Sequence, residues 1–175
     1  MQTITNFRAT LNRADRIRII AYWTVTLLVA YENAAGAVWV LLQVEYPRMV
    51  LAHLGYPQYL QYILGPCELA CAAALLAPRL PRVKEWAYAG TFLKYSAAFF
   101  SYLYVGVDRP GLGAAISAAV MAVLTVLSWA LRPADRRLPE PMPVRQTPAS
   151  SWIISAVSLG LMLILALFSL PKGSH

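Results

Sequence analysis

The sequence predicts an all-α membrane protein, with a four-helix transmembrane bundle followed by a fifth transmembrane helix near the C-terminus. Its composition is the first reason. Of the 175 residues, 59% are hydrophobic and only 13% are charged, whereas ordinary globular chains carry about 25% charged residues. The second reason is that the apolar residues come in long blocks, without the alternation typical of half-buried strands.

Five of these blocks are long enough to cross a bilayer as helices, which takes roughly 20 residues. They cover residues 19–42, 59–77, 86–107, 112–131 and 152–170. The first block is too long for the apolar part of a cleaved signal peptide and has Glu32 at its centre. We therefore expect it to be the first transmembrane helix.

The basic residues predict how the chain is oriented. Eleven of its 15 lysines and arginines precede the first block, lie between the second and third, or lie between the fourth and fifth. Because short cytoplasmic loops are enriched in these residues, we expect the N-terminus in the cytoplasm and the C-terminus outside, in the inner (plasma) membrane. Topology and anionic lipid then account for the net charge of +7, so nucleic-acid binding is not expected.

Four parts follow from this pattern. Residues 1–18 are predicted to form a basic interfacial segment on the cytoplasmic surface, and residues 19–131 the four-helix membrane domain. Residues 132–150 contain five prolines, which favour an extended cytoplasmic linker. Residues 151–175 hold the fifth helix, read as an appendage to the core, and a short outer tail. Residues 43–58 are predicted to be an outer loop.

Three charged residues lie deep in the first three blocks. Glu32, Glu68 and Lys94 fall within about 3 Å of one common depth. An ionisable group there costs roughly 2.5–3.5 kcal/mol on insertion scales, so each needs a partner, water or a functional role. Small residues share their predicted helix faces, which indicates that all three point into the bundle.

Two interpretations of this charged interior stay open. In the functional one, Glu32, Glu68 and Lys94 form a proton or cation relay, or a pocket that recognises a polar headgroup. In the structural one, Lys94 pairs with one glutamate to hold the helices together, and the other glutamate is protonated.

Other residues are weaker candidates. Tyr95 is next to Lys94 and could form a hydrogen bond in the charged interior, and His53 in the outer loop is a candidate ligand or proton acceptor. Cys67 and Cys71 lie one helical turn apart, a spacing that suits a disulfide poorly, so we expect them to be packing residues. No metal-ligand cluster, phosphate-binding loop or nucleophile–base set is visible, and no metal site is predicted.

Two stretches carry a resemblance to a known family: HLGYPQY at residues 53–59 and KEWAYAG at residues 84–90. With Tyr22-Trp23 at the start of the first block and Gly65-Pro66 in the second, they resemble the DoxX-like family of small four-helix membrane proteins. The resemblance covers residues 22–131. The chain departs from the family pattern in the second helix, where Glu68 stands in place of a basic residue.

The resemblance implies a small integral-membrane subunit or assembly partner that is not an enzyme by itself. The wider superfamily includes a subunit of an archaeal thiosulfate:quinone oxidoreductase, a component of a mycobacterial oxidoreductase complex, and eukaryotic proteins that help membrane proteins assemble or leave the endoplasmic reticulum. On this reading the charged interior binds a polar small molecule or a lipid headgroup.

Two alternatives remain. One is a membrane subunit of a quinone-linked oxidoreductase, with a quinone as cofactor. The other is a proton-coupled small-molecule carrier, which with so few helices would work as an oligomer. The expected partners are the lipid bilayer and either another membrane protein or further copies of this chain.

Overall fold

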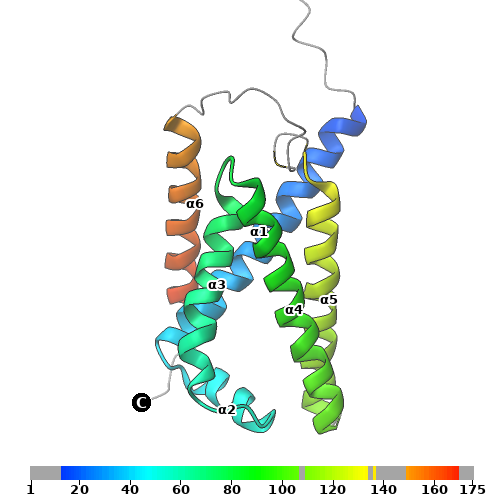
Figure 1. Ribbon diagram of the computed structural model, residues 1–175, viewed down its shortest axis with the longest axis vertical. Coiled ribbons are helices and arrows are strands. Elements are labelled where there is room, and N and C mark those ends of the chain that lie inside the picture. Colours follow the sequence, from blue (N-terminus) through cyan, green and yellow to red (C-terminus); the bar gives the residue numbers. More distant parts are fainter. Residues whose placement is uncertain (1–12, 107–108, 134–135, 137–148, 170–175) are drawn as a thin grey trace, which may run out of the picture.

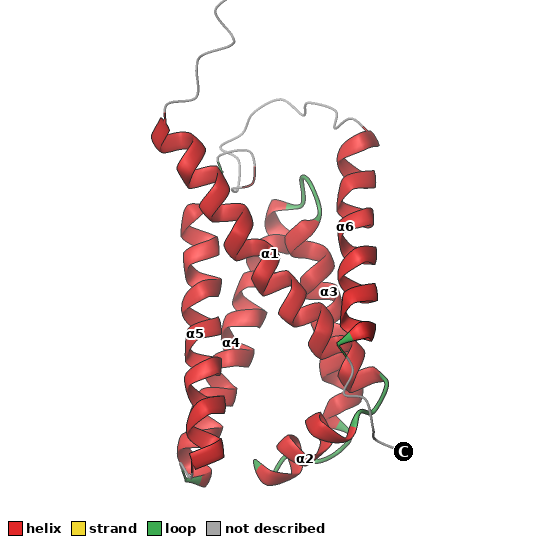
Figure 2. Ribbon diagram, turned by 180° about the vertical axis from the view of Figure 1, so that it is seen from behind, coloured by secondary structure: helices red, strands yellow, loops and turns green. Residues whose placement is uncertain are grey.

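The computed structural model of the chain describes residues 13–106, 109–133, 136 and 149–169. This part of the chain is helical and contains no strand, as predicted. Its helices, shown in Figures 1 and 2, are α1 (Arg13–Leu41), α2 (Glu45–His53), α3 (Leu60–Leu76), α4 (Pro81–Val105), α5 (Arg109–Leu131) and α6 (Ala149–Phe168).

The five long helices alternate in direction. The starts of α1, α4 and α6 and the ends of α3 and α5 lie together, while α2 lies at the opposite end (Figure 1). This alternation gathers the basic residues that flank the helices at what we name the basic end. The basic end carries Arg16, Arg18, Arg79, Arg82, Arg132 and Arg136.

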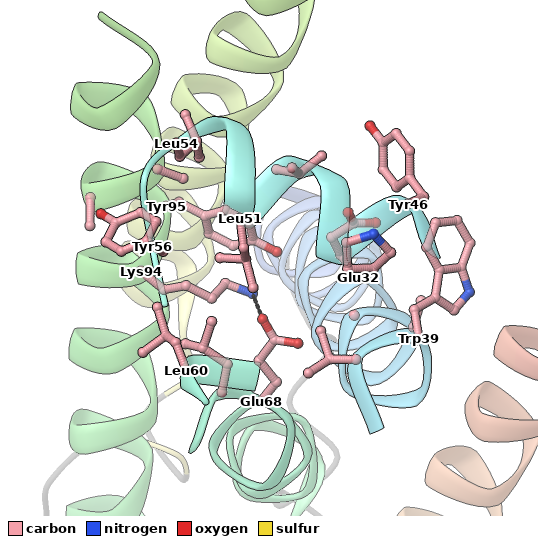
Figure 3. Close-up of a pocket in the computed structure, with 18 of the residues that line it drawn as sticks. Glu32, Trp39, Tyr46, Leu51, Leu54, Tyr56, Leu60, Glu68, Lys94 and Tyr95 are labelled. Carbon is pink, nitrogen blue, oxygen red and sulfur yellow. Dashed lines mark hydrogen bonds and ion pairs between the residues drawn. The ribbon is translucent and has the colours of Figure 1, made fainter. Parts of the chain in front are cut away.

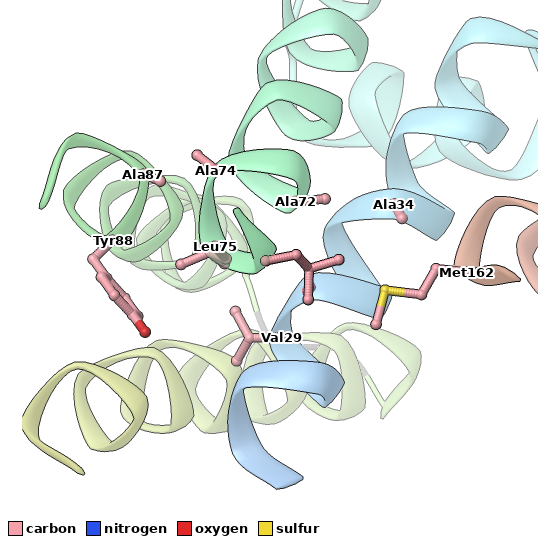
Figure 4. Close-up of a cluster of buried hydrophobic side chains, with 10 residues drawn as sticks. Val29, Ala34, Ala72, Ala74, Leu75, Ala87, Tyr88 and Met162 are labelled. Carbon is pink, nitrogen blue, oxygen red and sulfur yellow. The ribbon is translucent and has the colours of Figure 1, made fainter. Parts of the chain in front are cut away.

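The helix α1 is the centre of the bundle. It is inclined across the other long helices (Figure 2) and packs against α3, α5 and α6. Much of the core beside it consists of alanine (Figure 4), and small side chains let helices approach closely. The core cluster contains Val29, Ala30, Ala34, Ala72, Ala74, Leu75, Leu76, Ala87, Tyr88 and Met162.

Two features in the N-terminal third of the chain differ from the prediction, one helix boundary and one additional helix. The helix α1 starts at Arg13, so residues 13–18 belong to the first long helix, while residues 1–12 lie outside the described part. The predicted outer loop contains α2. Glu45 lies in the first turn of α2, where its negative charge interacts favourably with the positive end of the helix dipole. Because a helix of nine residues is marginal alone, contacts such as that between the Trp39 and Tyr46 rings help to hold it.

The helix α6 lies closer to the core than the appendage we expected. It packs against both α1 and α3. Met162 and Ala166 are buried, and the Ser155 hydroxyl donates a 2.9 Å hydrogen bond to the Leu76 carbonyl near the end of α3. A helix without charged side chains is thus held by apolar contacts and by this hydrogen bond.

Two helical stretches, Asp15–Leu41 and Gly111–Leu131, are long and apolar enough by themselves to cross a membrane. The shorter α3 has 17 residues and rises about 25 Å, slightly less than the roughly 30 Å hydrocarbon layer. The helix α4 is longer but carries Lys94 in its middle. Large apolar side chains are exposed along the outside of several helices, among them Leu28, Phe100 and Ile116.

Lys84 is fully buried at the basic end, although the sequence placed it in the connection between the second and third apolar blocks. Its Nζ donates hydrogen bonds to the carbonyls of Ala74 (2.8 Å) and Leu75 (2.6 Å). Both carbonyls belong to the last turn of α3, where they have no partner within the helix. Lys84 therefore joins the start of α4 to the end of α3.

A second ionic contact joins α4 to the end of α5. Arg132 Nη1 lies 2.8 Å from Glu85 Oε1, and the Trp129 indole donates a 2.9 Å hydrogen bond to Glu85 Oε2. The Arg132 guanidinium also lies 5.0 Å from the centroid of the Tyr88 ring, within the range of a cation–π contact. The basic end is therefore tied together by buried charges.

We predict that a chain ending at residue 138, which lacks α6, still inserts and stays monodisperse in detergent, because Val29, Leu75 and Tyr88 keep their mutual contacts. Its melting temperature should fall, since α1 and α3 lose the contacts of α6. Met162→Ala in the full chain should reproduce part of this destabilisation, by lowering the free energy of unfolding by about 2 kcal/mol. Aggregation of the shortened chain during size-exclusion chromatography would show that the core needs α6.

Candidate ligand-binding site

A largely buried ion pair and an attached hydrogen bond join three helices in the middle of the bundle. Lys94 Nζ on α4 lies 3.1 Å from Glu68 Oε1 on α3 and donates a 3.0 Å hydrogen bond to Asn33 Oδ1 on α1. The Asn33 amide donates in turn to the Val29 carbonyl (2.8 Å), which fixes its orientation. Figure 3 shows the Lys94 and Glu68 side chains pointing toward one another. We name Lys94, Glu68 and Asn33 the polar node.

Sequence reasoning placed Glu32 with Glu68 and Lys94, but the structure puts Asn33 in that position. Successive residues of a helix point about 100° apart, and the Lys94 ammonium meets the Asn33 side chain rather than that of Glu32. Glu32 is exposed and makes no hydrogen bond or ion pair with any residue that the structure describes. Asn33 could have been found by its place next to Glu32, since it too is polar within an apolar block.

Gly36 makes room for the Glu68 carboxylate against α1. A Cβ atom at this position would lie 2.5 Å from Glu68 Oε2 and 3.2 Å from Glu68 Cδ. Such distances are too short for an undisturbed contact, so any side chain here would push the carboxylate away. Gly36 thus allows the ion pair to lie directly against the α1 backbone.

The polar node borders a cavity of about 900 Å³ formed by α1, α2, α3 and α4, within the range of about 300–1,000 Å³ common for ligand sites. Glu32 lines the α1 side of this cavity, apart from the node (Figure 3). Most of the other lining residues are apolar or aromatic. The aromatic ones are Tyr31, Trp39, Tyr46, Tyr56, Tyr95 and Tyr102.

The helix α2 and the turn after it cover one end of the cavity. Leu51 and Leu54 of this segment line it. Gly55 follows with φ +77°, in the left-handed region that favours glycine. This turn brings the Tyr56 hydroxyl to 2.6 Å from Ser101 Oγ on α4, where the two share a hydrogen bond. The LGYP motif thus has a structural role, which is to fasten the cover to the opposite wall.

Three buried polar groups of cavity-lining residues have no hydrogen-bond partner among the described residues. They are Glu68 Oε2, the Tyr95 hydroxyl and the Trp39 indole N–H. The Glu68 and Tyr95 side chains are about nine-tenths buried or more, and Lys94 Nζ lies 4.1 Å from the centroid of the Tyr95 ring. Buried polar atoms are nearly always hydrogen-bonded in proteins, so these atoms are available to a ligand.

The remaining candidates lie away from this site. His53 is exposed in the last turn of α2 and is not among the cavity-lining residues. Cys67 is exposed and Cys71 is half-buried, and both thiols are free. The structure therefore brings Lys94, Glu68 and Tyr95 together, places Glu32 on the wall of the same cavity, and leaves His53 outside it.

The apolar outer surface and the polar, partly unpaired interior define a class, that of small helical membrane proteins. The comparison with protein families narrows this class, because the model of the DoxX-like family matches residues 24–131. The chain belongs to the DoxX-like family, as the two sequence stretches indicated. The match runs from α1 to the end of α5 and does not include α6. No curated protein and no solved structure matches the chain.

We predict that Lys94→Met alone lowers the unfolding free energy by about 3 kcal/mol, because it leaves Glu68 buried without its counter-charge. Proton uptake by the surviving carboxylate limits the loss. Adding Glu68→Gln should recover about 1–2 kcal/mol, the coupling expected of groups in contact. A double-mutant cycle in detergent, measured by thermal unfolding, checks this.

The matched control for this cycle is Glu45→Gln in the Lys94→Met background. Because Glu45 is an exposed carboxylate of α2 outside the cavity lining, its substitution should act nearly independently. Strict additivity of the Glu68 and Lys94 changes would contradict the energetic importance of the ion pair.

Proposed function

We propose that this DoxX-like chain crosses the inner membrane five times, through α1, α3, α4, α5 and α6, with the basic end in the cytoplasm. The gathering of flanking arginines at one end supports this orientation. The family match supports a four-helix membrane domain over residues 19–131. The prolines of residues 132–150 support a separate linker between this domain and α6.

The proposed function is binding. We propose that the cavity holds the polar head of an amphiphile, either a lipid headgroup or a polar small molecule. The observation that carries the proposal is the position of two unpartnered buried polar atoms, Glu68 Oε2 and the Tyr95 hydroxyl, at an otherwise largely apolar cavity. A polar head would satisfy these atoms, while the rest of the ligand would contact the apolar wall.

The apolar part of such a ligand has a route to the outside. Leu93 of α4 lines the cavity and is 63% exposed, so the cavity reaches the molecular surface there. Leu60 and Leu64 of α3 line the facing wall. In the proposed topology this opening between α3 and α4 meets the hydrocarbon of the bilayer, which suits an acyl or alkyl chain.

A binding role fits a subunit or assembly partner, which works together with another membrane protein or with further copies of this chain. The wide apolar surface formed by residues such as Phe100 and Ile116 is available for lipid or for such a partner. In this proposal the ligand stabilises the arrangement of α2, α3 and α4 around the cavity, since it would contact all three helices.

We predict that a reporter fused after residue 140 is cytoplasmic and that one fused at His175 is outside, because 11 of the 15 lysines and arginines belong to the N-terminal, second and fourth connecting segments. Paired alkaline phosphatase and fluorescent-protein fusions measure both positions. A reporter after residue 140 that is active outside, or two termini on the same side, would contradict the topology.

We predict that the protein purified gently from its native membrane carries a bound amphiphile, detectable by native mass spectrometry. Ala98→Phe should abolish this adduct, because Ala98 lines the cavity and a larger side chain fills it. Ala89→Phe is the matched control, since Ala89 is an exposed alanine of the same helix that does not line the cavity.

Equal adducts in both variants would contradict binding in this cavity. A quinone identified as the adduct would favour the oxidoreductase-subunit alternative over a lipid-binding role.

A further inference from the structure

The charge of the cavity wall restricts which headgroup fits. Among the described lining residues, the formally charged ones are Glu32, Glu68 and Lys94. Lys94 is committed to Glu68 and Asn33, so the ion pair is neutral by itself and Glu32 is left as an excess negative group. An anionic headgroup would add a second uncompensated negative charge to the site, whereas a cationic one would neutralise the first.

The unpartnered carboxylate oxygen adds a second requirement. Glu68 Oε2 is buried, carries no hydrogen bond within the described part of the chain, and accepts but cannot donate when ionised. The ligand must therefore present an N–H or O–H donor at this end of the cavity. A quaternary ammonium has the charge without the donor, and an alcohol has the donor without the charge.

The aromatic lining agrees with a cation. Six of the lining residues are Tyr or Trp, and aromatic faces attract ammonium groups through their quadrupole. The Lys94 ammonium already uses this interaction with the Tyr95 ring at 4.1 Å. The Tyr95 hydroxyl has no partner among the described residues and can accept a hydrogen bond from the same headgroup.

We propose that the ligand is an amphiphile whose head is a primary ammonium, held between the carboxylates of Glu32 and Glu68 and the Tyr95 hydroxyl, with its apolar chain leaving past Leu93. This inference rests on the proposed function and adds the chemical class of the headgroup. The ammonium belongs either to a free alkyl amine or to the headgroup of a membrane lipid.

Four probes with the same alkyl chain test the headgroup: dodecylamine, dodecyltrimethylammonium, dodecanol and dodecanoate. Their binding to the full chain in phosphatidylcholine nanodiscs at pH 7.4 is measured by displacement of tritiated dodecylamine, with empty nanodiscs subtracted. Dodecylamine should bind roughly tenfold more tightly than each of the others, because only its head offers both the charge and the N–H donors.

Substitutions of the two carboxylates test whether they bind the ammonium head. Glu32→Gln and Glu68→Gln should each weaken dodecylamine binding by roughly tenfold and remove its preference over dodecanol. Glu32→Gln is the safer variant because Glu32 has no partner in the described chain to lose, and melting temperature and size-exclusion profiles establish that each variant is folded. Glu45→Gln, which changes an exposed carboxylate of α2 outside the cavity lining, should leave binding unchanged.

The outcomes separate this inference from the function on which it rests. Tightest binding of dodecanol, dodecanoate or dodecyltrimethylammonium would overturn the primary-ammonium head and leave an amphiphile site in place. Failure of all four probes to bind would overturn both. Competition by lysophosphatidylethanolamine as strong as that by dodecylamine would support a lipid as the source of the ammonium, and competition by dodecylamine alone would support a free amine.

Discussion

The ion pair between Lys94 and Glu68 is the interaction on which the rest of this structure depends. Charges in an apolar bundle are tolerated only when they meet partners, and this requirement sets how α3 and α4 are rotated about their axes. The hydrogen bond from Lys94 to Asn33 extends the same constraint to α1. Gly36 then follows from the pair, since a side chain there would collide with the Glu68 carboxylate.

Two lysines of α4 fix the path of α3 and thereby create the cavity. Lys84 donates hydrogen bonds to the last carbonyls of α3 at the basic end. Lys94 forms its ion pair with Glu68 nearer the middle of α3. The two contacts are ten residues apart on α4, about 15 Å along the helix. Beyond the second contact α3 and α4 diverge (Figure 1), and α2 with the turn at Gly55 closes the end of the space between them.

The sequence predicted the long helices well because their apolar blocks end at prolines, glycines and charges. The block at residues 59–77 corresponds to α3 (Leu60–Leu76), and the family prediction is confirmed over residues 24–131. The helix α2 was missed because a short helix depends on tertiary contacts more than on its own sequence. The buried state of Lys84 was missed for a similar reason, since its partners are backbone carbonyls, which have no sequence signature.

The candidate site shows what depth alone can and cannot predict. Position along each block placed Glu32, Glu68 and Lys94 at one level, but pairing also depends on rotation about the helix axis, which differs by about 100° between Glu32 and Asn33. Lys94 forms an ion pair with Glu68 and a hydrogen bond with Asn33, and these contacts connect α4 to α3 and α1. Glu32 is left on the cavity wall, where no described residue compensates it, so packing gives no reason for its cost of roughly 2.5–3.5 kcal/mol in the apolar layer. The ligand proposed for the cavity would supply that reason.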